Sequence, residues 1–91
     1  MTANNSPVLT SKSSHIGGHR IIREIGLIKT DKTTFIGGAY DSFAEGLDDL
    51  KQVARSKGAN GIINIEVEKS GWSGKPTMVS GLAVIIESSS R

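Results

Sequence analysis

Residues 53–68, VARSKGANGIINIEVE, constrain the fold most, because they read as a helix end followed at once by a strand. Gly58 stands where the C-terminus of a helix favours a residue that tolerates a positive φ angle. The Asn-Gly pair that follows adds a turn signal. Ile63, Ile65 and Val67 then alternate with polar residues, the period of a strand with one solvated face. The segment therefore predicts a helix–strand junction, and it carries no catalytic group.

The residues before this junction predict an amphipathic helix over about 42–57. Ser42 and Glu45 have the Ser-x-x-Glu spacing of a capping box, which satisfies free backbone donors at a helix start. Gly46 costs such a helix about 1 kcal/mol relative to alanine, which a close contact at this position would explain. One stripe along the helix collects its apolar side chains, Phe43, Leu47, Leu50 and Ala54.

Two further strands are predicted, over residues 15–30 and 78–86. In the first, Gly26 indicates a bulge or a close backbone approach. Simple alternation places Ile21, Ile25 and Leu27 on one face and Ile22 and Ile28 on the other. A strand–helix–strand crossover makes its two strands parallel, and the short polar loop after residue 69 makes the last two strands an antiparallel hairpin. The prediction is an α+β fold, strand-helix-strand-strand, with a three-stranded mixed sheet covered by one helix.

The ends of the chain are polar, which predicts a flexible N-terminal tail over residues 1–14, a single domain over 15–88 and a C-terminal tail over 89–91. The absence of cysteine excludes disulfides and thiolate metal sites. The longest apolar run is too short to span a bilayer, and the N-terminus lacks a signal-peptide pattern, so we expect a cytoplasmic protein without a membrane partner. The net charge of +2 is scattered, without the dense basic stripe typical of nucleic-acid binding.

The last predicted strand is apolar on both faces, yet one helix can cover only one of them. Met78, Leu82, Val84 and Ile86 alternate with Val79, Ala83 and Ile85. An uncovered apolar face usually marks a partner surface, and the economical partner is a second copy of the same chain. The pattern therefore predicts a homo-oligomer. If Ile85 lies on the face away from the helix, a charge there should dissociate the assembly.

Three segments resemble the YbjQ-type family of small proteins, which carries the label of a heavy-metal-binding domain. They are residues 23–30 (REIGLIKT), 54–68 and 78–86 (MVSGLAVII), and the resemblance extends over roughly residues 16–87. It implies a strand–helix–strand–strand fold and a homopentamer whose sheets join around a central axis. The chain departs from the family in its short helix-entry loop and its extended polar N-terminus. The activity of the family is not established, so the resemblance predicts fold and assembly rather than chemistry.

His15 and His19 are the only histidines and form the first candidate site. Imidazole is a common ligand of zinc, copper and nickel. Residues four apart in an extended strand are about 13 Å apart, however, and no third soft ligand accompanies the pair. Surface histidines are therefore the favoured interpretation, and a metal site here would need ligands from neighbouring subunits.

Trp72 and Lys75, in the glycine-rich loop between the last two strands, form a second candidate for ligand or subunit contact. Packing is the favoured interpretation for the tryptophan, either over the edge of its own sheet or against a neighbouring subunit. Glu66 and Glu68 share one strand face and would form a carboxylate ring in a cyclic oligomer, able to bind a divalent metal ion. The polar lining of a solvated sheet face is the favoured interpretation for this pair. Asp48 and Asp49 are predicted to lie on the solvated face of the helix.

These patterns predict a non-enzymatic, homo-oligomeric binding or scaffold protein, with itself as partner and a pentamer as the expected assembly. The alternative is a metal-ion-binding module that uses His15 and His19 or the ring of Glu66 and Glu68. An enzyme is not predicted, because the sequence contains no nucleophile–base pair, full metal triad or nucleotide-binding fingerprint.

Overall fold

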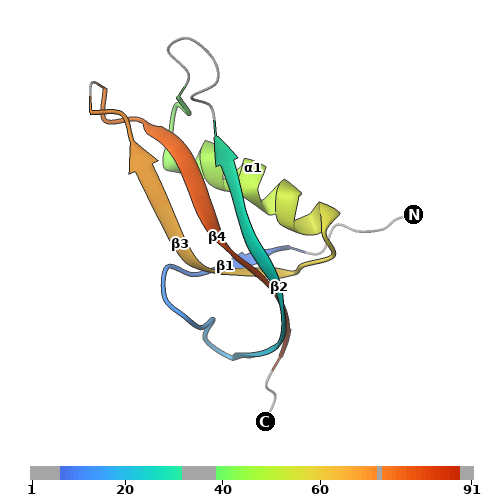
Figure 1. The fold of residues 1–91 in the computed structure, drawn as a ribbon. Coiled ribbons are helices and arrows are strands. Elements are labelled where there is room, and N and C mark those ends of the chain that lie inside the picture. The colour runs from blue at the N-terminus through green and yellow to red at the C-terminus, as the bar shows by residue number, and fades with distance from the viewer. Residues whose placement is uncertain (1–6, 32–38, 72, 89–91) are drawn as a thin grey trace.

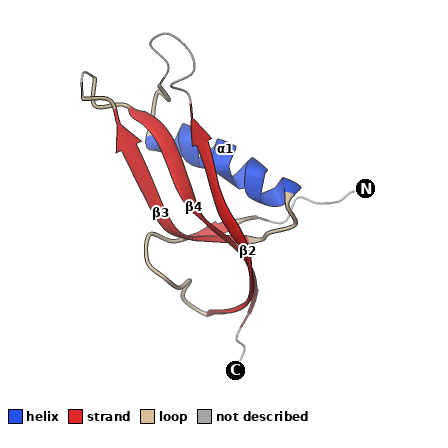
Figure 2. Ribbon diagram, in the orientation of Figure 1, coloured by secondary structure: helices blue, strands red, loops and turns tan. Residues whose placement is uncertain are grey.

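The computed structural model describes residues 7–31, 39–71 and 73–88. These residues form four strands and one helix: β1 (Leu9–Thr10), β2 (His19–Asp31), α1 (Phe43–Ser56), β3 (Gly61–Lys69) and β4 (Pro76–Ser88) (Figure 1). The strands make one sheet in the order β1-β3-β4-β2. Helix α1 lies across one face of this sheet (Figure 2). No helix within the described ranges is long and apolar enough to cross a membrane.

Strand β4 lies between β2 and β3 and pairs antiparallel with both of them. Strands β2 and β3 therefore run parallel to each other, as the crossover through α1 requires. The α+β class, the order β2, α1, β3, β4 and the antiparallel β3–β4 hairpin are all confirmed.

Both predicted ends of the helix are confirmed. Ser42 is the N-cap, and its Oγ accepts a hydrogen bond from the Glu45 N–H at 3.2 Å. Glu45 Oε1 in turn accepts a hydrogen bond from the Asp41 N–H at 2.9 Å. In a capping box the N-cap residue itself donates this second bond, whereas here the donor is the residue before Ser42. At the other end, Gly58 has φ of 85°, the left-handed conformation expected after a helix. Gly46 also has the predicted close contact, because a Cβ there would lie 2.8 Å from Val79 Cγ2.

The prediction of three strands is wrong, because β1 adds a fourth from the segment expected to be a tail. Leu9 and Thr10 pair parallel with the first two residues of β3. Beyond β1, the Ser11 N–H donates to the carbonyl of Ile62, and the Asn64 N–H donates to that of Ser13, each at 2.9 Å. A polar segment can pair through its backbone alone, and this capacity does not show in composition. Residues 9–13 therefore belong to the folded domain.

Two clusters of buried apolar side chains lie on opposite faces of the sheet. The helix-face cluster is made of Val8, Ile28, Leu50, Ala54, Ala59, Ile62, Ile65, Val79 and Ala83, with Phe43 and Leu47 packed against it. The far-face cluster is made of Ile16, Ile63, Val84 and Ile86, with Leu9, Ile21 and Leu82 packed against it. The predicted helix stripe is confirmed by the first cluster. The second shows that residues 9–16 cover part of the face expected to lack cover within the chain (Figure 1).

A bulge in β3 overturns the predicted common face of Ile63, Ile65 and Val67. Asn64 has φ of 54°, a left-handed conformation that asparagine tolerates better than most residues. The pairing with β4 is irregular between Ile63 and Glu66. Ile63 therefore packs in the far-face cluster, while Ile65 packs in the helix-face cluster. One extra residue in the strand has reversed the phase of the alternation.

Two irregularities in β2 have the same effect on the first predicted strand. They lie between Ile21 and Arg23 and between Glu24 and Gly26, and they confirm the bulge indicated by Gly26. Ile21 packs in the far-face cluster and Ile25 against the helix-face cluster, so their predicted common face is wrong.

Ile85 lies on the helix side of β4, in alternation with the far-face residues Val84 and Ile86. The prediction that a charge at Ile85 would dissociate the assembly applied only if Ile85 lay on the face away from the helix, and it does not.

Candidate functional site

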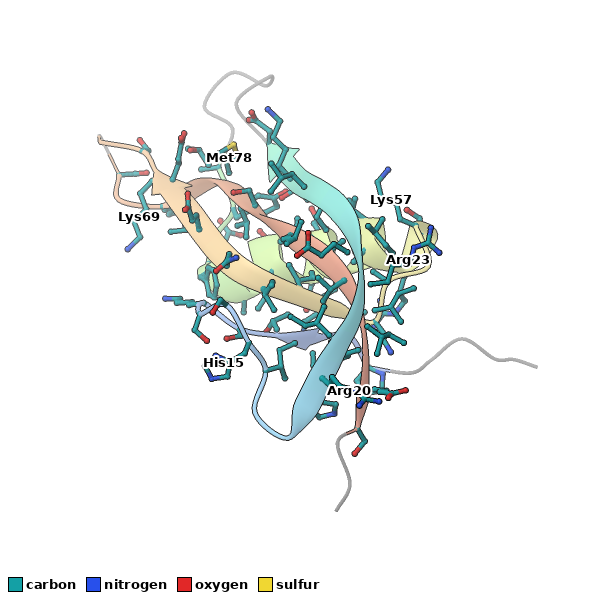
Figure 3. All side chains as sticks on the ribbon, turned by 60° about the horizontal axis from the view of Figure 1, so that its bottom comes forward. His15, Arg20, Arg23, Lys57, Lys69 and Met78 are labelled. Atoms are coloured by element: carbon teal, nitrogen blue, oxygen red, sulfur yellow. The ribbon has the colours of Figure 1, made fainter. Side chains whose placement is uncertain are left out.

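The far-face cluster covers only one end of the sheet, and a groove opens on the same face toward the β3–β4 hairpin. This far-face groove has a volume of about 550 Å³, within the range of small-molecule sites. Three strands line it, through Leu27, Ile28, Lys29, Asn64, Glu66, Met78 and Ser80. Figure 3 shows Met78 at this end of the sheet, with His15 in the loop at the other end.

The strand register places three polar residues in a row across the groove. Lys29 of β2 and Glu66 of β3 are both paired with Ser80 of β4, from its two sides. Directly paired residues project from the same face of a sheet. Because neighbouring strands are about 4.8 Å apart, the Cα atoms of Lys29 and Glu66 are about 10 Å apart. An ammonium group, a hydroxyl group and a carboxylate therefore follow one another across the groove.

The two charges of this row do not take part in an ion pair within the described part of the chain. The ion pairs there join Arg20 to Glu87 and Lys75 to Asp41. Lys29 and Glu66 are both exposed. Their charges are available to a bound molecule, and in an open groove they are screened by salt.

Apolar side chains lie on both sides of the row. Leu27 precedes Lys29 on β2 and is 84% exposed. Met78 precedes Ser80 on β4 and is half-buried. Methionine is unbranched and adapts its shape to what it contacts. The groove therefore combines a polar row with apolar contact surface along the strand direction.

Asn64 contributes a fourth kind of polar group to the groove, an exposed amide near Glu66. Its left-handed backbone is held by the hydrogen bond from its N–H to the Ser13 carbonyl. Backbone conformations of this kind are frequent at functional sites, although a bulge alone also accounts for this one.

The predicted histidine pair lies at the other end of the sheet from the groove. His15 is exposed in the loop before β2, and His19 pairs with Ser88 at the last residue of β4. His19 Nδ1 lies 3.0 Å from the Gly17 carbonyl oxygen, within hydrogen-bonding distance. Within residues 7–31, 39–71 and 73–88, no three His, Cys, Asp or Glu residues are grouped so as to hold a metal ion.

The other residues predicted as candidate sites do not gather at one place in the described part of the chain. Trp72 lies outside the described residues. Lys75 Nζ is 3.7 Å from Asp41 Oδ1 in an exposed ion pair. Glu66 lines the groove, and Glu68 is paired with Met78 one step further along the same face.

Asp49 differs from its neighbour Asp48, although both were predicted to be solvated. Asp48 is exposed, whereas Asp49 is half-buried and interacts with Tyr40, which is only 2% exposed. Burial raises the pKa of Tyr40 above its ordinary value of 10.0, and the Asp49 carboxylate raises it further. This contact belongs to the helix side of the sheet and lies apart from the groove.

Sequence reasoning missed Lys29, Ser80 and Met78 as site residues. Each is an ordinary surface residue of a strand, and only the register places them together. The one local pattern that could have indicated this face is in β2, where Leu27, Lys29 and Asp31 occupy alternate positions of an outer strand.

No protein-family model matches the chain, and no curated protein matches it significantly. The functions proposed below therefore depend on the geometry of the chain and on the resemblance of its segments.

Proposed function

We propose that this chain is a cytoplasmic, non-enzymatic binding protein that assembles with copies of itself. Assembly is supported most by the outer edge of β2, which ends the sheet and is 13 residues long. Two large apolar side chains project from this strand, Leu27 at 84% exposure and Ile22 at 53%. An edge strand with exposed apolar side chains is a template for pairing with another chain.

A homopentameric ring is the proposed form, in line with the resemblance to YbjQ-type proteins. The two edges of the sheet are unlike, with β2 at one and β1 at the other. Contact between unlike edges is head-to-tail, and such contacts generate rings when the rotation closes. Both bulges in β2 lie before Gly26, so the residues after Gly26 form the regularly paired part of this edge strand.

A binding role is supported by the far-face groove. Its row of Lys29, Ser80 and Glu66 offers donors and acceptors to a ligand. The groove lies on an open sheet face, so it does not exclude water as most catalytic sites do. These features favour binding over catalysis.

Size-exclusion chromatography with light scattering tests the assembly. We expect about five times the chain mass of 9.6 kDa. Leu27→Glu should reduce this mass, because a charge would enter a dry contact. Gln52→Glu, on the exposed side of α1, is the matched control and should leave the mass unchanged. A wild-type monomer at micromolar concentration would contradict the proposed assembly.

A metal-ion-binding module is the alternative proposal, and one observation favours its carboxylate version. Glu66 and Glu68 pair with Ser80 and Met78, which places both carboxylates on the far face. A ring of subunits would repeat them around its axis. Elemental analysis of tag-free protein tests this alternative: a stoichiometric divalent metal would support it, and a metal content near zero would exclude it.

A further inference from the structure

The far-face groove presents opposite charges at its two sides, and we propose that it binds the free ends of a short peptide. The peptide's α-amino group would lie at Glu66 and its α-carboxylate at Lys29. Such binding deepens the binding role proposed above and rests on it.

The balance of charge across the groove selects this class of ligand. A phosphate or another simple anion would be attracted by Lys29 and repelled by Glu66, and a metal cation would meet the reverse. A zwitterion satisfies both groups at once. Neither group takes part in an ion pair within the described residues, so neither must be released from a partner first.

The spacing of the charges sets the length of the peptide. Two strand spacings separate Lys29 from Glu66, about 10 Å between Cα atoms. An extended chain spans about 3.3–3.6 Å per residue, so about three residues reach across. A single amino acid would reach only one of the two charges, unless the Lys29 and Glu66 side chains both bent inward.

The centre of the groove fits the middle of such a peptide. Ser80 stands between the two charges, and its hydroxyl can donate to or accept from a peptide group. Met78 lines the groove beside the row, where it offers contact to an apolar central side chain. The expected ligand is therefore a tripeptide with free ends and an apolar middle residue.

Isothermal titration calorimetry at low ionic strength tests this with Ala-Leu-Ala and its end-blocked forms. The assembled wild-type protein should bind the free tripeptide, and N-acetylation or C-amidation should each weaken binding by about two- to fivefold, as for exposed ion pairs. Added salt should weaken binding of the free peptide.

Single variants assign each end to its residue. Lys29→Gln should bind free and C-amidated peptide equally, and Glu66→Gln should bind free and N-acetylated peptide equally. Lys57→Gln and Asp48→Asn, both exposed and remote from the groove, should behave as the wild type. Thermal unfolding of each variant verifies that the fold is retained.

Two outcomes would overturn the proposal: equal affinity of the wild type for free and doubly blocked peptide, or no binding of the free peptide at millimolar concentration. Equal affinity would point instead to an internal segment of a protein chain as the occupant. Light scattering on the same samples separates these results from a failure of assembly, because a protein that assembles without binding peptide contradicts the peptide proposal alone.

Discussion

The two faces of the sheet are both apolar in sequence, yet they differ in how they are covered. On one face, the apolar stripe of α1 packs on the strands, and the helix-face cluster is buried along the length of the helix. On the other, a short N-terminal segment covers one end, chiefly with Leu9 and Ile16, and the remaining end is the far-face groove. A strand that is apolar on both faces therefore need not lack cover within its own chain. Here a two-residue strand and the segment after it cover one end of the face.

Leu50→Ala tests the helix-covered face and should have the largest effect. Leu50 is a residue of α1 that is fully buried against the sheet, so its truncation should lower the free energy of unfolding by about 2–5 kcal/mol. Chemical denaturation monitored by circular dichroism measures this. Gln52→Ala, on the exposed side of the same helix, should change stability by less than about 0.5 kcal/mol. A larger effect at Gln52 than at Leu50 would show that the helix is rotated from this position.

Ile16→Ala tests the cover of the far face. Ile16 is 9% exposed and packs in the far-face cluster, so we expect a loss of about 2 kcal/mol, the low end for such a truncation. The matched control is Ser14→Ala, two residues earlier and exposed, with an expected change below about 0.5 kcal/mol. Equal and negligible effects at both positions would show that the segment before β2 does not stabilise the far face, as predicted for a tail over residues 1–14.

Gly81→Ala and Gly61→Ala compare the packing of the two faces directly. A Cβ at Gly81 would lie 2.5 Å from Ile62 Cγ2 and 3.1 Å from the Ile63 carbonyl oxygen, on the helix side. This overpacking should cost about 1–3 kcal/mol. At Gly61 the nearest atoms are ends of side chains at 3.2 Å, which can move, so we expect little net change. Thermal unfolding of both variants measures the difference, and a costlier Gly61 change would mean that the far face is the tighter one.

The titration of Tyr40 should have the smallest effect and sharpens the description of the helix side. Because burial raises its folded-state pKa above 10.0, the free energy of unfolding should not depend on Tyr40 below pH 10. It should fall as the pH rises from 10 through the folded-state pKa. Tyr40 is the only tyrosine of the chain, so its ultraviolet absorbance reports the titration directly.

Two variants control this measurement. Asp49→Asn should move the pKa of Tyr40 back toward 10.0, because a negative charge that disfavours the tyrosinate is removed. Tyr40→Phe should remove this part of the alkaline loss of stability, while the lysines continue to titrate. Titration of folded Tyr40 below pH 10 would contradict the burial described above.

The helix and its junction with β3 could be predicted from the sequence, because their signals are local. Ser42 and Glu45 lie within one helical turn, and Gly58 needs only its own φ angle. Strands β2, β3 and β4 could be located, and the two faces of β4 follow the predicted alternation, but the faces of β2 and β3 could not be predicted because both strands contain bulges. The left-handed turn of the backbone at Asn64 reverses the faces of β3, and nothing in the alternating pattern marks one asparagine as a bulge.

The candidate site could not be predicted, because it depends on register. Lys29, Ser80 and Glu66 come from three strands, and a shift of one residue in either pairing would move a side chain to the other face. Strand β1 was missed for a related reason. Its pairing is made by backbone groups, which every sequence possesses.

The parallel pairing of β1 with β3 also orders the events of folding. The β3–β4 hairpin closes through a short loop, whereas the pairing of β1 with β3 and that of β2 with β4 both join distant parts of the chain. Long closures are slow and follow local ones, and β1 adds only two residues to the sheet, so β1 should dock last, on a sheet that already exists. Contacts absent from the transition state affect unfolding rates rather than folding rates. The N-terminal segment would then determine how long each native molecule persists, while α1 and the hairpin determine how quickly it forms.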